Sequence, residues 1–501
     1  METNKHRVKC YPSREEFYGL AKKGSVIPVY SEILADMETP VSAYKKIATG
    51  KYSFLLESME GGEKWARFSF IGSDPALIFR CKGNTVELIK NGTVQEKIET
   101  DNPLDVLQGI MDKYQLVEVE GLPRFCGGAV GYASYDMVRF IEDLPPQTTD
   151  DLNLYDAIFL ITETILIFDN LTNTIKIICN AHIDEHEKDV SGVYQNAQDK
   201  IGTIVSLLRR PSSYDETEPL GGGPIDISSN MAPEHFKDIV NQAKMSITAG
   251  EIIQVVLSQR FETPLQGNPF NVYRALRRVN PSPYMFYLTF EDLIIVGASP
   301  EVLVRVEGEQ IELRPIAGTR PRGKDEDEDE SFKKDLLSDP KEIAEHVMLV
   351  DLGRNDVGRV SQMGTVVVPE FLIVEKYSHV MHIVSDVRGL LQPGRDSFDV
   401  FKACFPAGTV SGAPKVRAMQ IIEELESSHR GPYAGAVGYF SFSGNMDFCI
   451  VIRTLLIKNN TVYFQAGAGI VADSQPEKEF QETVSKAKAL VKALQMVKEG
   501  M

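Results

Sequence analysis

LIIVGASPEVLVRVEGEQIELRPIAG, residues 293–318, is the stretch that decides the fold class. Branched apolar residues dominate it and predict successive antiparallel strands, with a turn at Glu307 to Gln310. Long parallel strand–helix–strand units with a glycine fingerprint are absent from the sequence. We therefore predict an α+β fold in which large antiparallel β-sheets are flanked by helices.

The flanking sequence agrees with this class. The amino-terminal half is rich in short strands, and Asn91-Gly92 predicts a type I′ hairpin between two of them. Further along, Pro233 predicts the first turn of a helix that ends at Gly250. Four segments carry the clearest strand pattern: YSFLLES (52–58), ALIFRC (76–81), TVELI (85–89) and TIKIICN (174–180).

The length of the chain predicts two lobes. It has 501 residues, whereas a single hydrophobic core stops growing at roughly 250–300 residues. The stretch PSSYDETEPLGGGP, residues 211–224, has no apolar period and is typical of a linker. We expect an amino-terminal lobe over residues 1–220 and a domain that carries the chemistry over residues 225–501.

Charge and composition exclude several classes of protein. The net charge is −18, from 53 Lys and Arg against 71 Asp and Glu, which argues against nucleic-acid binding. The polar start METNKHRVKC predicts no signal peptide, and the apolar stretch at residues 157–168 is too short to span a bilayer. Six cysteines without a CxxC pair predict reduced thiols. We expect a cytoplasmic protein without membrane contact, in which an anionic ligand needs local positive charge.

Three charged residues of the carboxyl-terminal half do not fit the apolar pattern of the helix or strand predicted around them. On a helix that begins near Glu342, Glu345 lies about 160° from Val347, so periodicity alone turns it to solvent. Glu482 lies opposite the apolar face of the last helix and faces solvent or a polar group such as a metal. Arg453 interrupts the buried strand predicted over residues 448–458, where it needs an ion-pair partner or an anionic ligand.

A small-residue loop and two histidines leave further alternatives open. The loop from Gly408 leads into a helix at Pro414, and this arrangement is either an anion-binding helix start or a tight connection. His379 and His382 lie in a strand-like segment, and an odd separation puts them on opposite faces. At most one of them faces a given pocket.

Taken together, the motifs resemble those of the chorismate-utilising enzymes. The resemblance is dense, in order along the chain, and covers most of residues 291–486. Within that family the chain is similar to the anthranilate-forming branch, through LLES (55–58), NPSPYMFYL (280–288) and Ala317 in PIAGT. The motifs that carry the resemblance are RPIAGTRPRG, EHVMLVDLGRNDVGRV, HVMHIVSDVRG, FPAGTVSGAPKVRAMQIIEELE, RGPYAGAVGYF and GAGIVADSQPEKEFQET.

The resemblance implies a magnesium-dependent lyase that converts chorismate and ammonia to anthranilate and pyruvate. It implies Glu345 and Glu482 as the Mg²⁺ ligands, Glu301 as the general acid for the departing hydroxyl, and His382 as the histidine of the second step. His379 is then structural. The substrate contacts it implies are Gly318, Thr319, Tyr433, Arg453 and the backbone of Gly467, Ala468 and Gly469, with Thr409 (catalytic) and Lys486 as weaker candidates.

Ala317 distinguishes between branches of the family. Branches that form aminodeoxychorismate, or that add water to form isochorismate or salicylate, carry a lysine there, which can attack covalently or activate water. Alanine can do neither, so the nucleophile is free ammonia. Ammonia is scarce at neutral pH, and no glutaminase nucleophile is evident in the sequence. The resemblance therefore implies a glutamine amidotransferase subunit as partner in a hetero-oligomer.

The resemblance also implies feedback inhibition by tryptophan. LLES and the NPSPYM segment resemble an allosteric tryptophan site, to be lined by Ser58, Pro283, Tyr284 and Met285. Its position across both predicted lobes suggests a coupling of about 1–3 kcal/mol. A rival hypothesis from another class is a tryptophan-sensing binding module without activity.

Overall fold

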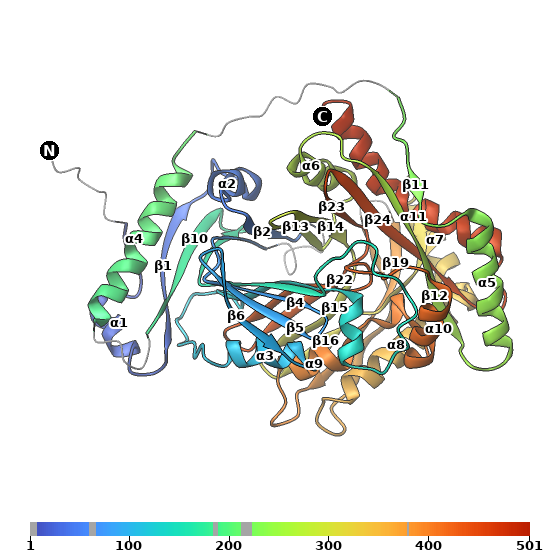
Figure 1. Cartoon of the computed structure of the whole chain (residues 1–501), viewed down its shortest axis with the longest axis horizontal. Helices are drawn as coiled ribbons and strands as arrows, with labels where there is room; N and C mark the ends of the chain where they lie inside the picture. Colours follow the sequence, from blue (N-terminus) through green and yellow to red (C-terminus); the bar gives the residue numbers. More distant parts are fainter. Residues whose placement is uncertain (1–7, 60–66, 184–188, 212–222, 378–379) are drawn as a thin grey trace.

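Two antiparallel sheets form the centre of the molecule, and helices cover their outer faces (Figure 1). The computed structural model describes residues 8–59, 67–183, 189–211, 223–377 and 380–501. Every ladder between named strands is antiparallel, which confirms the predicted fold class. Among the described helices, none has both the length and the apolar character needed to cross a bilayer.

Sheet A contains strands from both halves of the sequence. In spatial order it consists of β1 (Val26–Leu34), β10 (Thr174–His182), β9 (Thr164–Asp169), β3 (Phe68–Ser73), β2 (Tyr52–Glu57), β13 (Tyr284–Phe290), β14 (Leu293–Ser299), β23 (Thr454–Lys458), β24 (Thr461–Ile470), β12 (Gln254–Pro264) and β11 (Ser228–Ser229), with β20 (Gly412–Ala413) paired to β12.

Sheet B has the same mixed origin. Its order is β17 (Ile316–Pro321), β19 (Val380–Leu390), β16 (Gln310–Leu313), β15 (Val302–Glu307), β22 (Met446–Ile450), β21 (Ala436–Ser441), β7 (Gly128–Ala133), β8 (Ala157–Thr162), β4 (Leu77–Lys82), β5 (Thr85–Lys90) and β6 (Thr93–Glu99), with β18 (Val367–Lys376) paired to β19.

One helix shows how local signals set its ends. The helix predicted from Pro233 begins at that residue and ends at Thr248. Gly250 follows two residues later, with φ +79°. The helices are α1 (Arg14–Leu20), α2 (Pro40–Ile47), α3 (Pro103–Met111), α4 (Val190–Leu208), α5 (Pro233–Thr248), α6 (Pro269–Val279), α7 (Glu326–Ser338), α8 (Pro340–Gly358), α9 (Ser397–Cys404), α10 (Lys415–Leu425) and α11 (Pro476–Lys498), with 3₁₀ turns η1 (Tyr135–Phe140) and η2 (Gly408–Val410).

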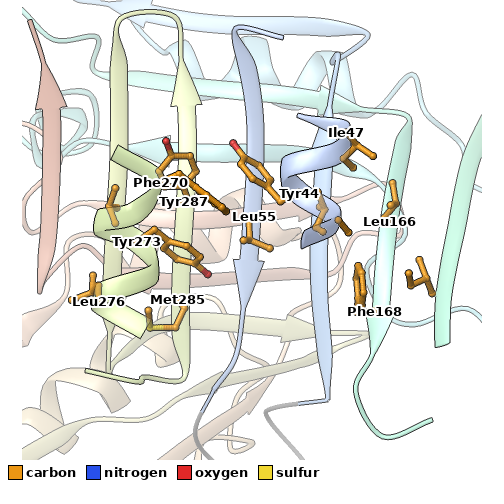
Figure 2. Close-up of a cluster of buried hydrophobic side chains, with 14 of the residues drawn as sticks. Tyr44, Ile47, Leu55, Leu166, Phe168, Phe270, Tyr273, Leu276, Met285 and Tyr287 are labelled. Atoms are coloured by element: carbon orange, nitrogen blue, oxygen red, sulfur yellow. The ribbon is translucent and has the colours of Figure 1, made fainter. Parts of the chain in front are cut away.

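Three apolar layers hold these elements together. One lies between the sheets, where Phe54 and Phe286 of sheet A meet Val437 and Tyr439 of sheet B. A second joins sheet A to its helices, and Figure 2 shows part of it, with side chains of α2 and α6 against β2, β9 and β13. The third joins sheet B to α3, α8 and α9. β7, β8 and β21 are buried along their whole length, on both faces, which explains why they consist mostly of apolar residues.

The two halves of the sequence lie side by side within both sheets. Each half supplies one continuous block of each sheet, and the blocks meet where β2 pairs with β13 and where β7 pairs with β21. The predicted linker falls almost entirely on residues 212–222, outside the described residues. The sheets therefore continue across the division predicted between residues 1–220 and 225–501.

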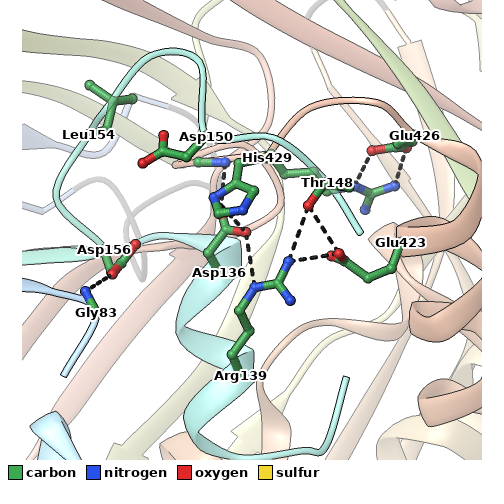
Figure 3. Close-up of polar contacts among 12 residues, drawn as sticks. Gly83, Asp136, Arg139, Thr148, Asp150, Leu154, Asp156, Glu423, Glu426 and His429 are labelled. Carbon is green, nitrogen blue, oxygen red and sulfur yellow. Dashed lines mark hydrogen bonds and ion pairs between the residues drawn. The ribbon is translucent and has the colours of Figure 1, made fainter. Parts of the chain in front are cut away.

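A buried polar network also joins the halves (Figure 3). Glu423 at the end of α10 accepts hydrogen bonds from Arg139 at 2.7 Å and from Thr148 at 3.0 Å. Asp136 accepts from the backbone N–H of Gly431 at 2.9 Å and lies 3.5 Å from His429 Nδ1. Burial raises the pKa of Asp136 to about 6.

One local prediction is wrong and another holds only in part, for the same reason. Within residues 293–318 the predicted turn at Glu307 to Gln310 is confirmed between the antiparallel strands β15 and β16, but β14 lies in sheet A whereas β15 and β16 lie in sheet B. Residues 448–458 form two strands, β22 and β23, which also lie in different sheets. A continuous apolar run does not reveal where a chain changes sheets.

Candidate active site

A cavity of about 660 Å³ lies where the chain crosses between the sheets. One crossing joins β14 to β15 and carries Glu301, and another joins β22 to β23 and carries Arg453. We call this space the main cavity. Twelve of the residues implied by the resemblance line it: Glu301, Gly318, Thr319, Glu345, His382, Thr409, Tyr433, Arg453, Gly467, Gly469, Glu482 and Lys486.

Glu301 is a buried acid at the wall of the main cavity, with 7% of its surface exposed. Burial raises its pKa to about 8, and this increase is partly opposed by Thr409, the backbone N–H of Ile316 and the charge of Lys486. At neutral pH its carboxyl group therefore holds a proton that it can donate.

Arg453 and Lys486 bring positive charge to the same cavity. Arg453 has φ +52°, and its guanidinium donates to the carbonyl of Lys486 at 2.9 Å. Lys486 donates to the Gly467 carbonyl at 2.9 Å and pairs with Glu482 at 2.8 Å. Arg453 is held by a carbonyl, so it keeps further N–H donors for an anionic ligand.

The glycines of β24 open a backbone edge to the main cavity. Their partners on β12, Ser258 and Val256, direct their N–H groups away from β24, to Glu426 and to the Ser411 carbonyl. Gly467 and Gly469 therefore turn their own main-chain groups to the opposite edge, away from β12. Gly467 must lack a side chain, because a Cβ would lie 2.7 Å from the Tyr433 hydroxyl.

Ala468 does not line the main cavity, contrary to the implied substrate contact. Strand alternation turns its side chain to the opposite face, where it is fully buried beside Leu257 and Ile470. Backbone N–H and C=O groups of successive residues in a strand point to opposite edges. Ala468 follows Gly467 and pairs with Leu257, so its main-chain groups point toward β12. The resemblance implied a substrate contact for three consecutive residues, whereas only alternate residues of a strand face the same cavity.

Glu345 and Glu482 meet across the main cavity from α8 and α11. Burial raises the pKa of Glu345, and the charges of Glu342 and Glu482 raise it further. Glu345 therefore does not face solvent, as the periodicity of its helix had indicated. The structure adds Glu342 and Glu479, which sequence reasoning missed, although each precedes its partner by one helical turn.

These carboxylates fit a magnesium ion. Among the described residues, no three acidic, histidine or cysteine side chains lie close enough to hold a metal by themselves. Mg²⁺ is usually bound by one or two carboxylates together with waters and substrate oxygens. Glu345 and Glu482 are therefore suitable oxygen ligands for an ion that a ligand completes.

His382 is oriented by the bulge of β17. Gly318 has φ +67° at this bulge, and its carbonyl lies 2.9 Å from His382 Nδ1, with Thr319 Oγ1 at 3.1 Å. Since a carbonyl only accepts, Nδ1 carries the hydrogen, and Nε2 of the neutral ring carries the lone pair. His379 lies outside the described residues.

A second cavity, of about 360 Å³, lies where the halves meet. We call it the junction cavity, and Ser58, Pro283, Tyr284 and Met285 all line it, as the resemblance implied. The Met285 side chain packs with Leu276 on the helix side of β13 (Figure 2). Charged residues that the sequence analysis did not identify also line this cavity, among them Arg124, Arg305 and Asp447.

Comparison with known proteins agrees with this arrangement. The family model for chorismate binding enzymes matches residues 51–492. Anthranilate synthase component 1 of Acetivibrio thermocellus is 48% identical over 97% of this chain and 98% of its own length. That of Aquifex aeolicus is 50% identical over 97% and 98%. The crystal structure of anthranilate synthase component I from Streptococcus pneumoniae has a TM-score of 0.76 and 39% identity, over 92% of this chain and 99% of that one.

Proposed function

The chain belongs to the chorismate binding enzyme family, and from this premise we propose that it is the large subunit of an anthranilate synthase, a lyase that converts chorismate and ammonia to anthranilate and pyruvate. The observation that carries the proposal is the meeting of Glu301, Arg453 and the Glu345–Glu482 pair in one cavity. This set matches a substrate with two carboxylates and a leaving hydroxyl.

The first step is an addition with loss of water. Arg453, Tyr433 and the backbone edge at Gly467 hold one carboxylate of chorismate. Ammonia forms a C–N bond to the ring, the bond to the ring hydroxyl breaks, and Glu301 donates the proton with which that hydroxyl leaves as water. The raised pKa of Glu301 supports this role, because a general acid must hold its proton at working pH.

In the second step a ring proton leaves, the C–O bond between the ring and the enolpyruvyl group breaks, and the released enolpyruvate takes up a proton to become pyruvate, which makes the ring aromatic. The lone pair on His382 Nε2 suits this residue to accept the departing ring proton, while the bond from Nδ1 to Gly318 fixes the ring orientation. Thr409 and Thr319 line the cavity beside Glu301 and His382 and contribute to orientation.

A magnesium ion is the proposed cofactor, held by Glu345 and Glu482. When bound, it would neutralise the second carboxylate and polarise the ring toward loss of the hydroxyl. Positive charge is needed there, because acids outnumber Arg453, Lys486 and Lys341 in the cavity wall before any dianion enters.

The nucleophile is proposed to be ammonia supplied by a glutamine amidotransferase subunit in a hetero-oligomer. Ala317 lines the main cavity and offers neither a nucleophile nor a base. This argues against the aminodeoxychorismate, isochorismate and salicylate branches. Tryptophan in the junction cavity is the proposed feedback inhibitor, and the cytoplasm is the proposed location. A sensing module without activity would not need the acids, arginine and histidine of the main cavity.

The test is turnover with an ammonium salt in the absence of a partner, with and without Mg²⁺. We expect blue-fluorescent anthranilate with Mg²⁺ and almost none without it. Glu482→Gln is expected to weaken Mg²⁺ binding in calorimetry and to abolish turnover with the fold intact, whereas Glu499→Gln, on the exposed end after α11, should behave as wild type. A non-aromatic amino or hydroxy product would refute the proposed function, and full activity of Glu482→Gln would refute the metal ligands.

A further inference from the structure

The two cavities share the chain segments that cross between the sheets. Cys449 lines the junction cavity, and Ile452 and Arg453, a few residues later, line the main cavity. In the neighbouring crossing, Ser299 lies opposite Tyr284 of the junction cavity and two residues before Glu301 of the main cavity. A displacement at one cavity therefore has a short route to the other.

Ser299 is the side chain at which the two crossings meet. It is fully buried, and its hydroxyl donates to the Ile450 carbonyl at 2.6 Å. The same oxygen accepts from the Glu301 backbone N–H at 3.4 Å and interacts with the Cys449 thiol. One hydroxyl thus contacts a residue of each cavity.

Backbone hydrogen bonds continue the same connection. The Ile450 N–H donates to the Glu301 carbonyl at 3.0 Å, and the Ala298 N–H donates to the Arg453 carbonyl at 3.2 Å. Glu301 and Arg453, both proposed to act on substrate, are therefore carried by crossings that are hydrogen-bonded to each other. The Ser299 hydroxyl is the side-chain part of that connection.

We propose that Ser299 is a positioning residue, which holds Glu301 in place through Ile450 and transmits to Glu301 the occupancy of the junction cavity. The inference rests on the proposed function, since it needs Glu301 to act on chorismate and tryptophan to occupy the junction cavity. Protein interiors are packed as closely as crystals, so a small displacement of one side chain is passed on to its neighbours. A ligand shifts the equilibrium between two conformations only if it interacts differently with each of them. Ser299 lies between the cavities, opposite Tyr284 in the ladder of β13 and β14 and bonded to Ile450 and Glu301.

The experiment compares Ser299→Ala with wild type in ammonium-dependent turnover, with and without L-tryptophan. Without tryptophan we expect kcat to fall about tenfold, as for loss of one hydrogen bond at the acid, and the chorismate KM to change far less. With tryptophan we expect its effect on chorismate kinetics to shrink toward none, while calorimetry still detects tryptophan binding. Ser441→Ala, another buried serine that lines neither cavity, is the matched control and should resemble wild type.

Each outcome decides the inference. Wild-type kcat in Ser299→Ala overturns it, as does a reduced kcat with tryptophan inhibition intact. Ser299→Cys keeps a weak donor of similar size and should give intermediate values. It takes over the test if circular dichroism shows that Ser299→Ala is unfolded. Wild-type protein that forms no anthranilate would refute the proposed function first, whereas active wild type with an unaffected variant refutes the role of Ser299 alone.

Discussion

At the scale of single residues, the protonation of Glu301 sets how the proposed enzyme responds to pH. Burial raises the pKa of its carboxyl group to about 8. As a general acid it acts in the protonated form, which is fully populated well below that value and is lost as pH rises through it. We expect kcat/KM for chorismate to fall on the alkaline side of about pH 8, when measured at a constant concentration of free ammonia.

Glu301→Gln isolates this contribution. The amide keeps the shape of the side chain but donates no titratable proton, so we expect a loss of about 10²–10⁴ in rate and no alkaline limb from this group. Glu163→Gln is a matched control, because Glu163 also lies between strands of different sheets, β8 and β9. An alkaline limb that persists in Glu301→Gln would assign the titration to another residue.

At the scale of elements, the shape of β24 controls access to its backbone edge. In Gly467→Ala the new Cβ would lie 2.7 Å from the Tyr433 hydroxyl and 2.9 Å from the Leu257 carbonyl. Overpacking of this kind costs about 1–3 kcal/mol. Because the strain falls on a proposed substrate contact, we expect chorismate affinity in calorimetry to fall roughly tenfold or more.

Gly202→Ala is the control for that substitution. Gly202 lies within α4, and a Cβ there meets nothing within 4 Å. Alanine in a helix interior lowers the entropy of the unfolded chain, so we expect unchanged affinity and a free energy of unfolding about 0.4–1 kcal/mol higher. Equal losses of affinity in both variants would show that the effect of Gly467→Ala is not local.

Elements with strong local signals were predictable from the sequence, and the crossings between sheets were not. Asn91 and Gly92 both have positive φ, at +52° and +74°, as the predicted type I′ turn requires. By contrast, the sequence gives no sign that the chain changes sheets at Pro300 and Glu301, because the strands on both sides of them are apolar. Periodicity assigned Glu345 to solvent and left Glu482 open between solvent and a polar group such as a metal, since it describes one helix at a time and not the cavity between two helices.

At the scale of the whole molecule, the junction cavity makes regulation a property of both halves. Its wall combines Ser58 after β2 with Pro283 and Tyr284 of the carboxyl-terminal half. We expect Ser58→Phe to fill part of the cavity and so to weaken tryptophan inhibition strongly. The uninhibited rate should stay within about twofold of wild type, because an allosteric site, coupled to the active site by about 1–3 kcal/mol, takes no part in the chemistry itself. Inhibition curves at several chorismate concentrations measure this, and an unchanged curve would exclude the site.

The shared sheets also predict how the chain unfolds. Separating residues 1–220 from 225–501 would expose the edges of β2, β7, β13 and β21, which the intact sheets cover by the ladders β2–β13 and β7–β21. Uncovered edges of apolar strands associate with other chains. Expressed alone, each half should therefore aggregate or remain unfolded, although each supplies a continuous block of both sheets.

The full chain should then melt in one calorimetric transition that L-tryptophan shifts as a whole. A ligand that binds only the folded state stabilises it by RT ln(1 + [L]/Kd), and a cavity lined by both halves passes that stabilisation to both. Tryptophan should thus raise the midpoint without splitting the peak, and Ser58→Phe should lose this shift but keep the single transition. Two peaks, of which tryptophan moves one, would mean that the halves unfold independently despite the ladders that join them.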